Sequence, residues 1–413
     1  MTRKSDAPAI RFKGFSDAWE QRKLGELVDR VVRKNTNNES TLPLTISAQY
    51  GLVDQITYFN NRVASRDVSN YYLVLNGEFA YNKSTSDGYP FGAVKRLDLY
   101  EKGVLSTLYI VFTPKKEQQI DSDFLTVFFD TDRWHKGVAE RAAEGARNHG
   151  LLNISAEDFF DIDLSVPKDV AEQKQIGAFI RQLDNLITLH QRKFEKLTNV
   201  KKSMLEKMFP QNGSSYPEIR FKGFTDPWEQ RKVSDLAEKT YGGGTPTTSN
   251  EAYWNGDIPW IQSSDVVDGK LLGVEPRKWI TQDGLNNSAA QLIPGNSIAI
   301  ITRVGVGKLA FMPYSYATSQ DFLSLSKLNA EPLFTVYACY KKLQSELNAV
   351  QGTSIKGITK DELLAKNIMV PRYAEQQQIG AFFKQLDNLI TLHQRELEKL
   401  QNIKKSMLEK MFV

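Results

Sequence analysis

The sequence predicts an α+β protein in which two mixed α/β domains are separated by two long antiparallel coiled-coil helices, in a pseudo-two-fold (circular) arrangement. Two internal repeats carry this prediction. Residues 171–209 and 374–412 are identical at 32 of 39 positions, and residues 8–23 and 217–232 are identical at 13 of 16 positions. Because the stretches between the repeats look unrelated, we interpret the chain as a constant frame that carries two different units.

The order of the repeats divides the chain into six segments. They are a short N-terminal segment (1–23), variable unit one (24–170), a central long repeat (171–209), a joint with the second short segment (210–232), variable unit two (233–373) and a C-terminal long repeat (374–413). If the two termini were joined to make a circle, this order would consist of two equivalent halves. We therefore expect the two termini to lie close together.

The composition is that of an ordinary globular protein. A chain of 413 residues predicts two to four domains. One cysteine, Cys339, excludes an internal disulfide framework and any cysteine-rich zinc module. No apolar run follows the basic N-terminus and no stretch of eighteen apolar residues occurs, so we expect a cytoplasmic protein without a membrane span. The net charge of +4 permits nucleic-acid binding but does not by itself predict it.

The long repeat has the pattern of a coiled-coil helix. Its seam residues alternate in steps of four and three, and proline stands only at its boundaries. Each helix would be roughly 55–60 Å long, and we expect an antiparallel pair with one variable unit at each end. The seam positions are Ile176, Ile180, Leu183, Ile187, His190, Phe194 and Leu197 in the first copy, and Ile379, Phe383, Leu386, Ile390, His393, Leu397 and Leu400 in the second.

Four polar residues interrupt this seam. They are His190 and Lys201 in the first copy and His393 and Lys404 in the second. The favoured interpretation is that they fix the register of the helices or end the apolar core. The alternative is a metal or proton site formed by the two histidines, which is a weak signal because no carboxylate or thiolate accompanies them.

The variable units predict more strand than helix. Short apolar runs such as 71–75, 106–112, 296–304 and 321–328 are separated by turn residues. Both units then become helical, pass through a glycine-containing polar loop and an acidic helix start, and close with a strand, IDLSVP or KNIMVP. This shared final order predicts that one fold occurs twice.

Motifs for catalysis are missing from the chain. It has no NPPF or DPPY methyltransferase tetrad, and TRVGVGKLA lacks the spacing of a phosphate-binding P-loop. The glycines 242–244 precede Thr-Pro instead of opening a helix after a clear strand, which argues against dinucleotide binding. We therefore expect that this chain catalyses no reaction, and no metal site is predicted outside the histidine alternative.

Polar and basic loops in both units are suited to nucleic acid. Arg and Lys can bind phosphates or guanine, Asn and Gln can pair with adenine, and Ser and Thr contact either, while glycine lets backbone amides come close. For any one loop a solvated turn is the alternative, and the recurrence in both units favours DNA contact. The candidate DNA-binding residues are Arg33, Lys34, Asn35, Tyr81, Asn82, Lys83, Ser84, Arg141, Arg147, Asn148, His149, Tyr241, Thr245, Thr247, Thr248, Gln262, Ser263, Arg303, Ser319, Gln320 and Lys356. The strongest of these are Lys83, Arg147, Thr245, Arg303, Gln320 and Lys356.

Several motifs together carry a family resemblance. They are RFKGFxDxWEQRK in the short repeats, the AEQxxIGxF start of the long repeats, GEFAYNKS and YPFGAV in unit one, and GGGTP, IPWI and QGTSIKGI in unit two. With the duplicated order of the segments, the chain resembles the specificity subunit of a type I restriction-modification enzyme. The resemblance covers essentially the whole sequence.

The resemblance implies a function and partners. The variable units would be target recognition domains, each reading one half of a bipartite, asymmetric double-stranded DNA sequence, and the helices would separate them. Two modification (methyltransferase) subunits, which bind S-adenosylmethionine and methylate adenine, would dock on the conserved regions. Restriction subunits using ATP and Mg²⁺ would join them, and this chain itself would bind no cofactor.

The resemblance also places the conserved regions at 172–209 and 375–412, and Trp19 and Trp228 in matching short segments. For these tryptophans we favour a packing role over partner binding. A coiled-coil adaptor with two protein-binding domains is the alternative function. A self-contained nuclease or methyltransferase is opposed by the missing motifs.

Overall fold

The computed structural model describes residues 7–47, 50–86, 88–142, 150–211, 213–349 and 357–413. Its internal contacts divide the chain into two compact units. Unit 1 comprises Met1–Leu189 and Leu397–Val413, and unit 2 comprises His190–Glu396. Each unit therefore contains one variable stretch and half of each long repeat. The segment boundaries expected from the sequence stay a prediction, since the contacts divide the chain inside the long repeats.

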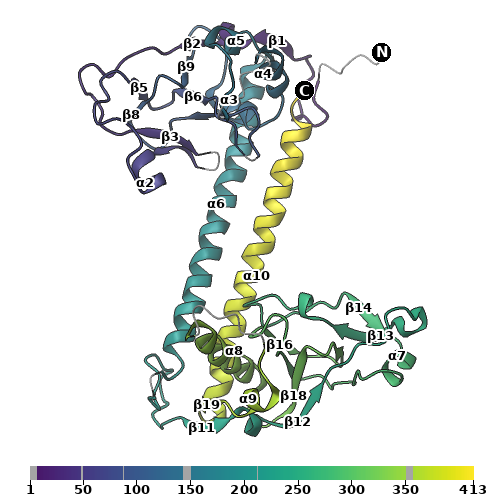
Figure 1. Cartoon of the computed structure of the whole chain (residues 1–413). Coiled ribbons are helices and arrows are strands. Elements are labelled where there is room, and N and C mark those ends of the chain that lie inside the picture. Colours follow the sequence, from purple (N-terminus) through teal and green to yellow (C-terminus); the bar gives the residue numbers. More distant parts are fainter. Residues whose placement is uncertain (1–6, 48–49, 87, 143–149, 212, 350–356) are drawn as a thin grey trace. The chain divides into compact units, whose positions relative to one another are not determined.

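Unit 1 is built around a four-stranded antiparallel sheet, and Figure 1 labels its strands β2, β9 and β6. Its elements are β1 (Glu20–Lys23), α1 (Leu24–Leu27), β2 (Val28–Arg30), β3 (Leu44–Ser47), β4 (Gly51–Asp54), α2 (Gln55–Phe59), β5 (Tyr72–Leu75), β6 (Phe79–Asn82), β7 (Ala93–Arg96), β8 (Lys102–Leu105), β9 (Ile110–Pro114), α3 (Ser122–Phe129), α4 (His135–Arg141), α5 (Ala156–Phe160) and β10 (Asp163–Val166). The sheet has the order β2-β9-β6-β7, and β3-β4 and β5-β8 form separate pairs. Aromatic residues fill its core: Phe79 stacks on Phe112 at 5.4 Å, and Tyr81 stacks on Phe159 at 4.4 Å.

Unit 2 repeats this sheet and adds a different one. Its elements are β11 (Glu229–Lys232), η2 (Val233–Leu236), β12 (Ala237–Gly242), η3 (Glu251–Tyr253), β13 (Trp254–Ile261), η4 (Ser263–Asp265), β14 (Lys278–Ile280), α7 (Gln282–Asn286), β15 (Ser297–Ile301), β16 (Leu309–Met312), β17 (Ala317–Thr318), β18 (Phe322–Leu328), α8 (Pro332–Ala349), α9 (Lys360–Leu364) and β19 (Asn367–Val370). The main sheet has the order β12-β18-β15-β16, and the second has the order β14-β13-β17.

The two main sheets confirm that one fold occurs twice. Their strands follow the same order along the chain and in space, and the closing strands pair alike, with Glu20 opposite Val166 and Glu229 opposite Val370. The acidic starts predicted before those closing strands are capped helices. Ser155 accepts a hydrogen bond from the backbone of Asp158, and Thr359 forms a capping box with Glu362.

The long repeats form helices α6 (Val170–Lys207) and α10 (Tyr373–Lys410), each of 38 residues. Within unit 2 they pair antiparallel, because His190 meets His393 and Lys201 meets Asp387. Within unit 1, Asp184 of α6 binds Lys404 of α10 at 2.7 Å. All fourteen predicted seam residues are buried or half-buried, as a heptad seam requires.

The short repeats close each unit against both long helices. The backbone nitrogen of Ile10 donates to the carbonyl of Lys410 at 3.0 Å, and that of Ile219 donates to Lys207 at 2.9 Å. The first contact confirms that the two ends of the chain lie close together. Trp19 packs on Phe412 and Trp228 on Phe209, and both tryptophans are buried, which confirms their packing role.

Candidate nucleic-acid interface

Each domain is fixed to the start of a long helix by the same set of contacts. Arg11 forms a bidentate ion pair with Glu172 at 2.6 and 2.8 Å, and Arg220 forms the same pair with Glu375 at 2.8 Å. Both glutamate side chains are 1% exposed. One turn further on, Gly177 lets α6 approach the backbone of Phe124, as Gly380 lets α10 approach Phe334. These contacts attach each variable domain firmly to one long helix.

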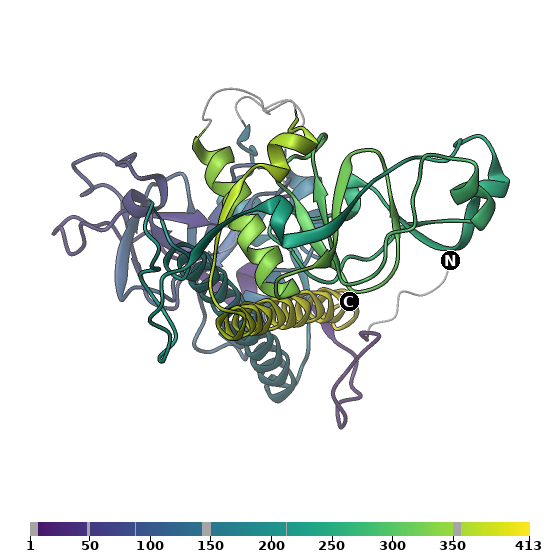
Figure 2. The same ribbon diagram turned by 90° about the horizontal axis from the view of Figure 1, so that it is seen from below.

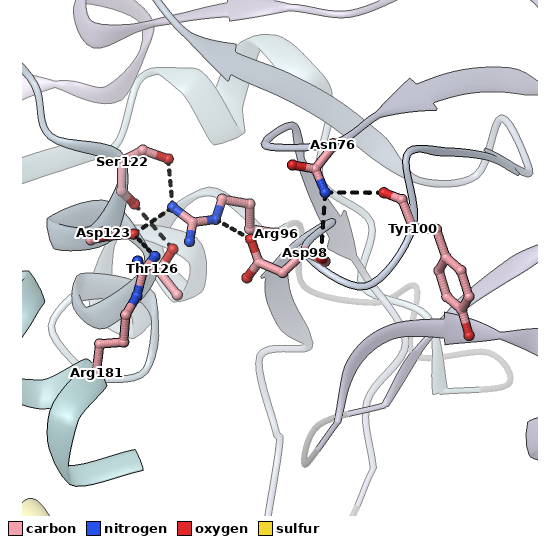
Figure 3. A network of polar contacts seen from close by, with 8 residues as sticks. All are labelled: Asn76, Arg96, Asp98, Tyr100, Ser122, Asp123, Thr126 and Arg181. Carbon is pink, nitrogen blue, oxygen red and sulfur yellow. Dashed lines mark hydrogen bonds and ion pairs between the residues drawn. The ribbon is translucent and has the colours of Figure 1, made fainter. Parts of the chain in front are cut away.

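In unit 1 a charged network extends this attachment into the sheet. Figure 3 shows Arg96 of β7 between Asp98 and Asp123, with Nε and Nη1 distances of 2.7 and 2.8 Å. Arg181 of α6 reaches the same Asp123. The side chain of Arg96 is 9% exposed, so this network links the helix to the edge strand of the domain from inside.

Four of the loops predicted from the sequence meet at one edge of unit 2. The backbone nitrogen of Gly244 donates to Thr318 at 2.8 Å, that of Ser319 to Ile261 at 2.9 Å, and that of Thr302 to Asp321 at 2.8 Å. These bonds bring together residues 243–245, 262–263, 302–303 and 319–320, which we call rim 2. Rim 2 lies where β12, β13, β15 and β17 end.

The glycines of rim 2 serve internal packing. A Cβ on Gly243 would overlap the carbonyl oxygen of Ser319, and one on Gly244 would overlap the backbone of Ala289. The Gly244 amide binds Thr318, and its carbonyl accepts from Trp260 Nε1 at 3.0 Å. This corrects the idea that these glycines bring free amides toward DNA, since the Gly244 backbone is already bonded on both sides.

Two exposed side chains of rim 2, Gln320 and Arg303, carry polar groups that can bind the edges of DNA bases. Thr245 Oγ1 donates to Gln320 Oε1 at 2.6 Å, which orients the amide of Gln320. Its amide nitrogen has no hydrogen-bond partner within the part of the chain that the structure describes. Arg303 is exposed and forms no ion pair with any described residue. A glutamine amide and a free guanidinium are the groups that pair with adenine and guanine edges.

The other candidates of unit 2 have mixed surroundings. Thr247 and Thr248 are exposed, Gln262 and Ser263 are half-buried at the start of η4, and Tyr241 is half-buried under the ammonium of Lys239 at 4.7 Å. Ser319 is 5% exposed and lies against Asp321, which corrects its assignment as a DNA contact.

Unit 1 has a smaller rim in the equivalent position. The backbone nitrogen of Leu152 donates to Lys83 at 3.0 Å, just as that of Ile358 donates to Thr302 in unit 2. Residues 82–84 and 150–152 form what we call rim 1. Within it Asn82 caps the backbone of Ser84, Ser84 is exposed, and Lys83 Nζ donates to the carbonyl of Ile154 at 3.3 Å.

Two unit 1 candidates are buried. Tyr81 is fully buried, its hydroxyl donates to Phe91 at 2.9 Å, and burial raises its pKa. Asn35 is also fully buried and donates to the carbonyl of Ser40 at 2.8 Å. Their polar groups stabilise the fold, which corrects the prediction that they contact DNA.

Three further candidates of unit 1 have intramolecular partners. Arg141 binds the carboxylate of Asp161 at 2.8 Å, and Arg33 binds Glu78 at 2.8 Å. Lys34 lies over the ring of Tyr72 at 4.3 Å. Arg33 and Lys34 adjoin β5 and form no hydrogen bond with the described residues of rim 1. Arg147, Asn148, His149 and Lys356 lie outside the described residues and stay predictions.

Sequence reasoning missed a basic and aromatic cluster in unit 2. Lys278 Nζ lies 5.5 Å from the ring of Trp254 and 5.8 Å from that of Trp260. Beside it, Arg277 Nε lies 3.5 Å from Oδ1 of the buried Asp265, an oxygen without a hydrogen bond. The run PRKWI, which places two basic residues directly before a tryptophan, was the signal that could have marked this cluster.

The two seam histidines face each other. Their Nδ1 atoms lie 3.1 Å apart, a distance that a single shared proton explains. Burial, His190 and Lys193 lower the pKa of His393. Among the described residues no group of three or more His, Cys, Asp or Glu side chains could hold a metal ion.

Comparison with known proteins decides the family. The model of the type I restriction modification DNA specificity domain matches residues 16–199 and 225–402. The chain belongs to this family. The two matches begin and end at equivalent positions of the repeats, so each covers the second half of a short repeat, a variable unit and most of a long helix.

Relatives in this family include specificity subunits from an archaeon and a bacterium. The chain is 21% identical to the putative MjaX specificity subunit of Methanocaldococcus jannaschii over 410 residues, 94% of this chain and 92% of that protein. It is 28% identical to the MjaIX specificity subunit of the same organism over 45% of this chain and 44% of that one. It is 31% identical to the EcoR124I/EcoR124II specificity subunit of Escherichia coli over 37% of this chain and 39% of that one.

A solved structure shows that this family fold extends over the whole chain. The type I restriction-modification S subunit from M. genitalium matches with a TM-score of 0.63 at 12% identity, covering 98% of this chain and 99% of that one. None of the helices in the described ranges is long and apolar enough to cross a membrane.

Proposed function

We propose that this chain is the noncatalytic DNA-specificity subunit of a type I restriction-modification complex. Each domain reads one half of a bipartite, asymmetric target in double-stranded DNA, unit 1 through rim 1 and its neighbouring loops and unit 2 through rim 2. This proposal rests on the observation that polar loops converge at equivalent edges of two sheets with the same topology. The long helices set the distance between the half-sites, about one turn of B-DNA.

The proposed partners fit the duplication. The long helices expose leucines at equivalent positions, Leu186 and Leu189 in α6 and Leu389 and Leu392 in α10, with exposed fractions of 43 to 52%. Two equal apolar patches suit two copies of one partner, which we take to be modification subunits. Restriction subunits join the same complex.

The cofactors and the chemistry belong to these partners. S-adenosylmethionine binds the modification subunit, which flips the target adenine out of the duplex and methylates it. ATP and Mg²⁺ serve the restriction subunit, and this chain holds no cofactor. The assembly acts on chromosomal and incoming DNA in the cytoplasm.

Methylome sequencing tests this function. Cells carrying this chain with its modification partner are expected to methylate adenines in one bipartite sequence with a fixed spacer. A mobility shift on random-sequence DNA with the purified complex is expected to select the same sequence. Absence of any DNA preference in both assays would favour the coiled-coil adaptor, and methyl transfer by the purified chain alone would contradict a noncatalytic role.

A heptad change tests the spacing role. Inserting seven residues at equivalent points of α6 and α10 is expected to lengthen the preferred spacer and leave both half-sites unchanged. A variant with seven residues added to the joint at 210–216 serves as control, because that joint lies outside both helices. An unchanged spacer in a folded insertion variant would contradict the role of the helices as a ruler.

A further inference from the structure

The two lysines that interrupt the seam occupy equivalent positions and form equivalent ion pairs. Lys201 Nζ of α6 lies 2.6 Å from Asp387 of α10, and Lys404 Nζ of α10 lies 2.7 Å from Asp184 of α6. The side chains of Lys201 and Asp387 are 10% and 14% exposed. Each unit thus contains a lysine–aspartate pair that joins the two long helices, and we call each pair a socket.

In unit 2, groups from the recognition domain complete the socket. The hydroxyl of Tyr337 on α8 donates to Asp387 Oδ2 at 2.6 Å, and Lys201 donates to the carbonyl of Gly269 at 3.0 Å. Burial raises the pKa of the Tyr337 hydroxyl, and Asp387 raises it further, so the hydroxyl keeps its proton and acts as a donor. The ring of Tyr337 packs on Phe383 at 5.0 Å where α8 meets α10, a region seen from below in Figure 2.

In unit 1 a different group completes the equivalent socket. Asp130, at the C-terminal end of α3, lies 3.5 Å from Lys404 and 2.6 Å from Lys95 of β7. A carboxylate at a helix C-terminus is electrostatically unfavourable by itself, so the two lysines explain its presence. Burial lowers the pKa of Lys404, but the charges of Asp130 and Asp184 outweigh burial and raise it overall.

The contrast between the two sockets separates their constant and variable parts. The lysine and the aspartate come from the duplicated helices, whereas Tyr337, Gly269 and Asp130 come from the domains that differ. A constant ionic pair that takes a domain-specific partner is the arrangement expected of a joint that accepts different domains but holds each in one orientation. Polar contacts suit this task because they are directional, whereas apolar packing tolerates rotation.

We propose that Tyr337 and Asp130 are positioning residues that lock each recognition domain in one orientation on the long helices. Resting on the proposed function, we further propose that the two locks restrict the DNA spacer to a single length. Neither residue needs to touch DNA. Loss of a lock would let its domain reach half-sites displaced by one base pair, with unchanged reading of the bases.

Pulsed electron paramagnetic resonance on the full chain tests the orientation directly. Spin labels at Thr248→Cys and Asn388→Cys would report the distance between domain and helix within unit 2, since both positions are exposed. The native Cys339 is buried, and burial raises its pKa to about 12, so it does not compete for the label.

Tyr337→Phe is the informative variant for unit 2. Because one hydrogen bond to a charged group is lost, we expect the share of molecules outside the main distance peak to rise roughly tenfold. Tyr314→Phe is the matched control, because its hydroxyl donates to Val274 at 2.7 Å without contacting a long helix. Equal distance distributions in the two variants would overturn the proposed lock.

Methylome sequencing of the assembled complex tests the spacer. Tyr337→Phe and Asp130→Asn are each expected to raise methylation at spacers one base pair longer or shorter by roughly tenfold, with both half-sites kept. Asp161→Asn, which loses ion pairs to Lys23 and Arg141 only, is the control for Asp130→Asn. A fixed spacer or altered half-site bases would refute the spacer role. If the wild-type complex methylates no bipartite site, the proposed function fails, and the resonance measurement still decides the lock.

Discussion

Unit 1 and unit 2 share their attachments and differ at their rims. In both, an arginine of the short repeat pairs with the first glutamate of a long helix, and a tryptophan packs on the phenylalanine that ends the other copy. In contrast, rim 2 gathers four loops and is flanked by a three-stranded sheet, whereas rim 1 gathers two loops and is accompanied by two separate strand pairs.

This difference shows which contacts each part of the sequence serves. The arginine, tryptophan, glutamate and phenylalanine of these attachments are repeated, since both units must fit the same support. Residues at the rims differ between the two units, and the recognition of two different half-sites would require this difference. Shared internal contacts thus give one physical reason for the near-identity of the repeats, and the proposed shared partners would give a second.

The largest expected effect comes from breaking the equivalent ion pairs. Glu172→Ala and Glu375→Ala each leave a largely buried arginine unpaired, which should lower the free energy of unfolding by about 3–5 kcal/mol. Chemical denaturation measures the free energy of unfolding of both variants. Asp226→Ala, which loses an exposed pair with Arg372, is the control and should cost about 0–1 kcal/mol. A large loss in only one of the two glutamate variants would contradict the equivalence of the units.

A smaller effect is expected at the helix glycines. In Gly177→Ala the new Cβ would lie 2.7 Å from Cβ of Asp123, and in Gly380→Ala it would lie 2.9 Å from Cβ of Leu333. We expect each to destabilise by about 1–3 kcal/mol through overpacking, despite the higher helix propensity of alanine. Gly242→Ala, where a Cβ meets nothing within 4 Å, is the matched control. Stabilisation of both helix variants would show that the close contacts at Gly177 and Gly380 do not attach the domains to the helices.

Rim 2 should affect recognition and not stability. Gln320→Ala and Arg303→Ala are expected to weaken binding of the complex to its target by about 1–3 kcal/mol and to relax one half-site only. Titration of the complex against targets varied in each half measures this. Gln230→Ala, an exposed glutamine on β11, is the control and should leave binding unchanged. Relaxation of both half-sites would contradict separate reading by the two units.

The smallest effect concerns the histidine pair. The lowered pKa of His393 means that the unfolded chain binds more protons near pH 6, so this residue destabilises the fold as pH falls below its ordinary pKa of 6.5. Replacing both histidines by leucine should add about 1 kcal/mol of apolar burial and flatten the decline of the melting temperature between pH 7.5 and 5.5. His135, whose pKa is lowered by burial, should retain part of the decline. An unchanged slope would contradict the lowered pKa of His393.

Much of the fold could be predicted from the sequence. The heptad seam, the circular order and the shared end of both domains depend on periodicity and repetition, which are local properties of the chain. The sequence did not predict that the boundary between the two compact units lies inside the long helices. It depends on which half of each helix packs on which domain, as Lys404 does on Asp130.

The site was harder to predict, because composition does not report burial. Tyr81 and Asn35 belong to polar stretches of the sequence, but both side chains are fully buried, and Gly243 is required by packing under Ser319. The convergence of 243–245, 262–263, 302–303 and 319–320 needed the strand order. The lysines at 201 and 404 were visible as interruptions of the seam, but their partners on the domains were not.

Exchange of one domain tests the central claim most directly. Residues 24–170 would be replaced by the corresponding unit of another family member, and the methylome of cells carrying the chimera with its modification partner would be sequenced. We predict that one half-site changes while the other half-site is retained. A change in both half-sites, or in neither, would contradict the claim that two separately reading domains share one repeated support.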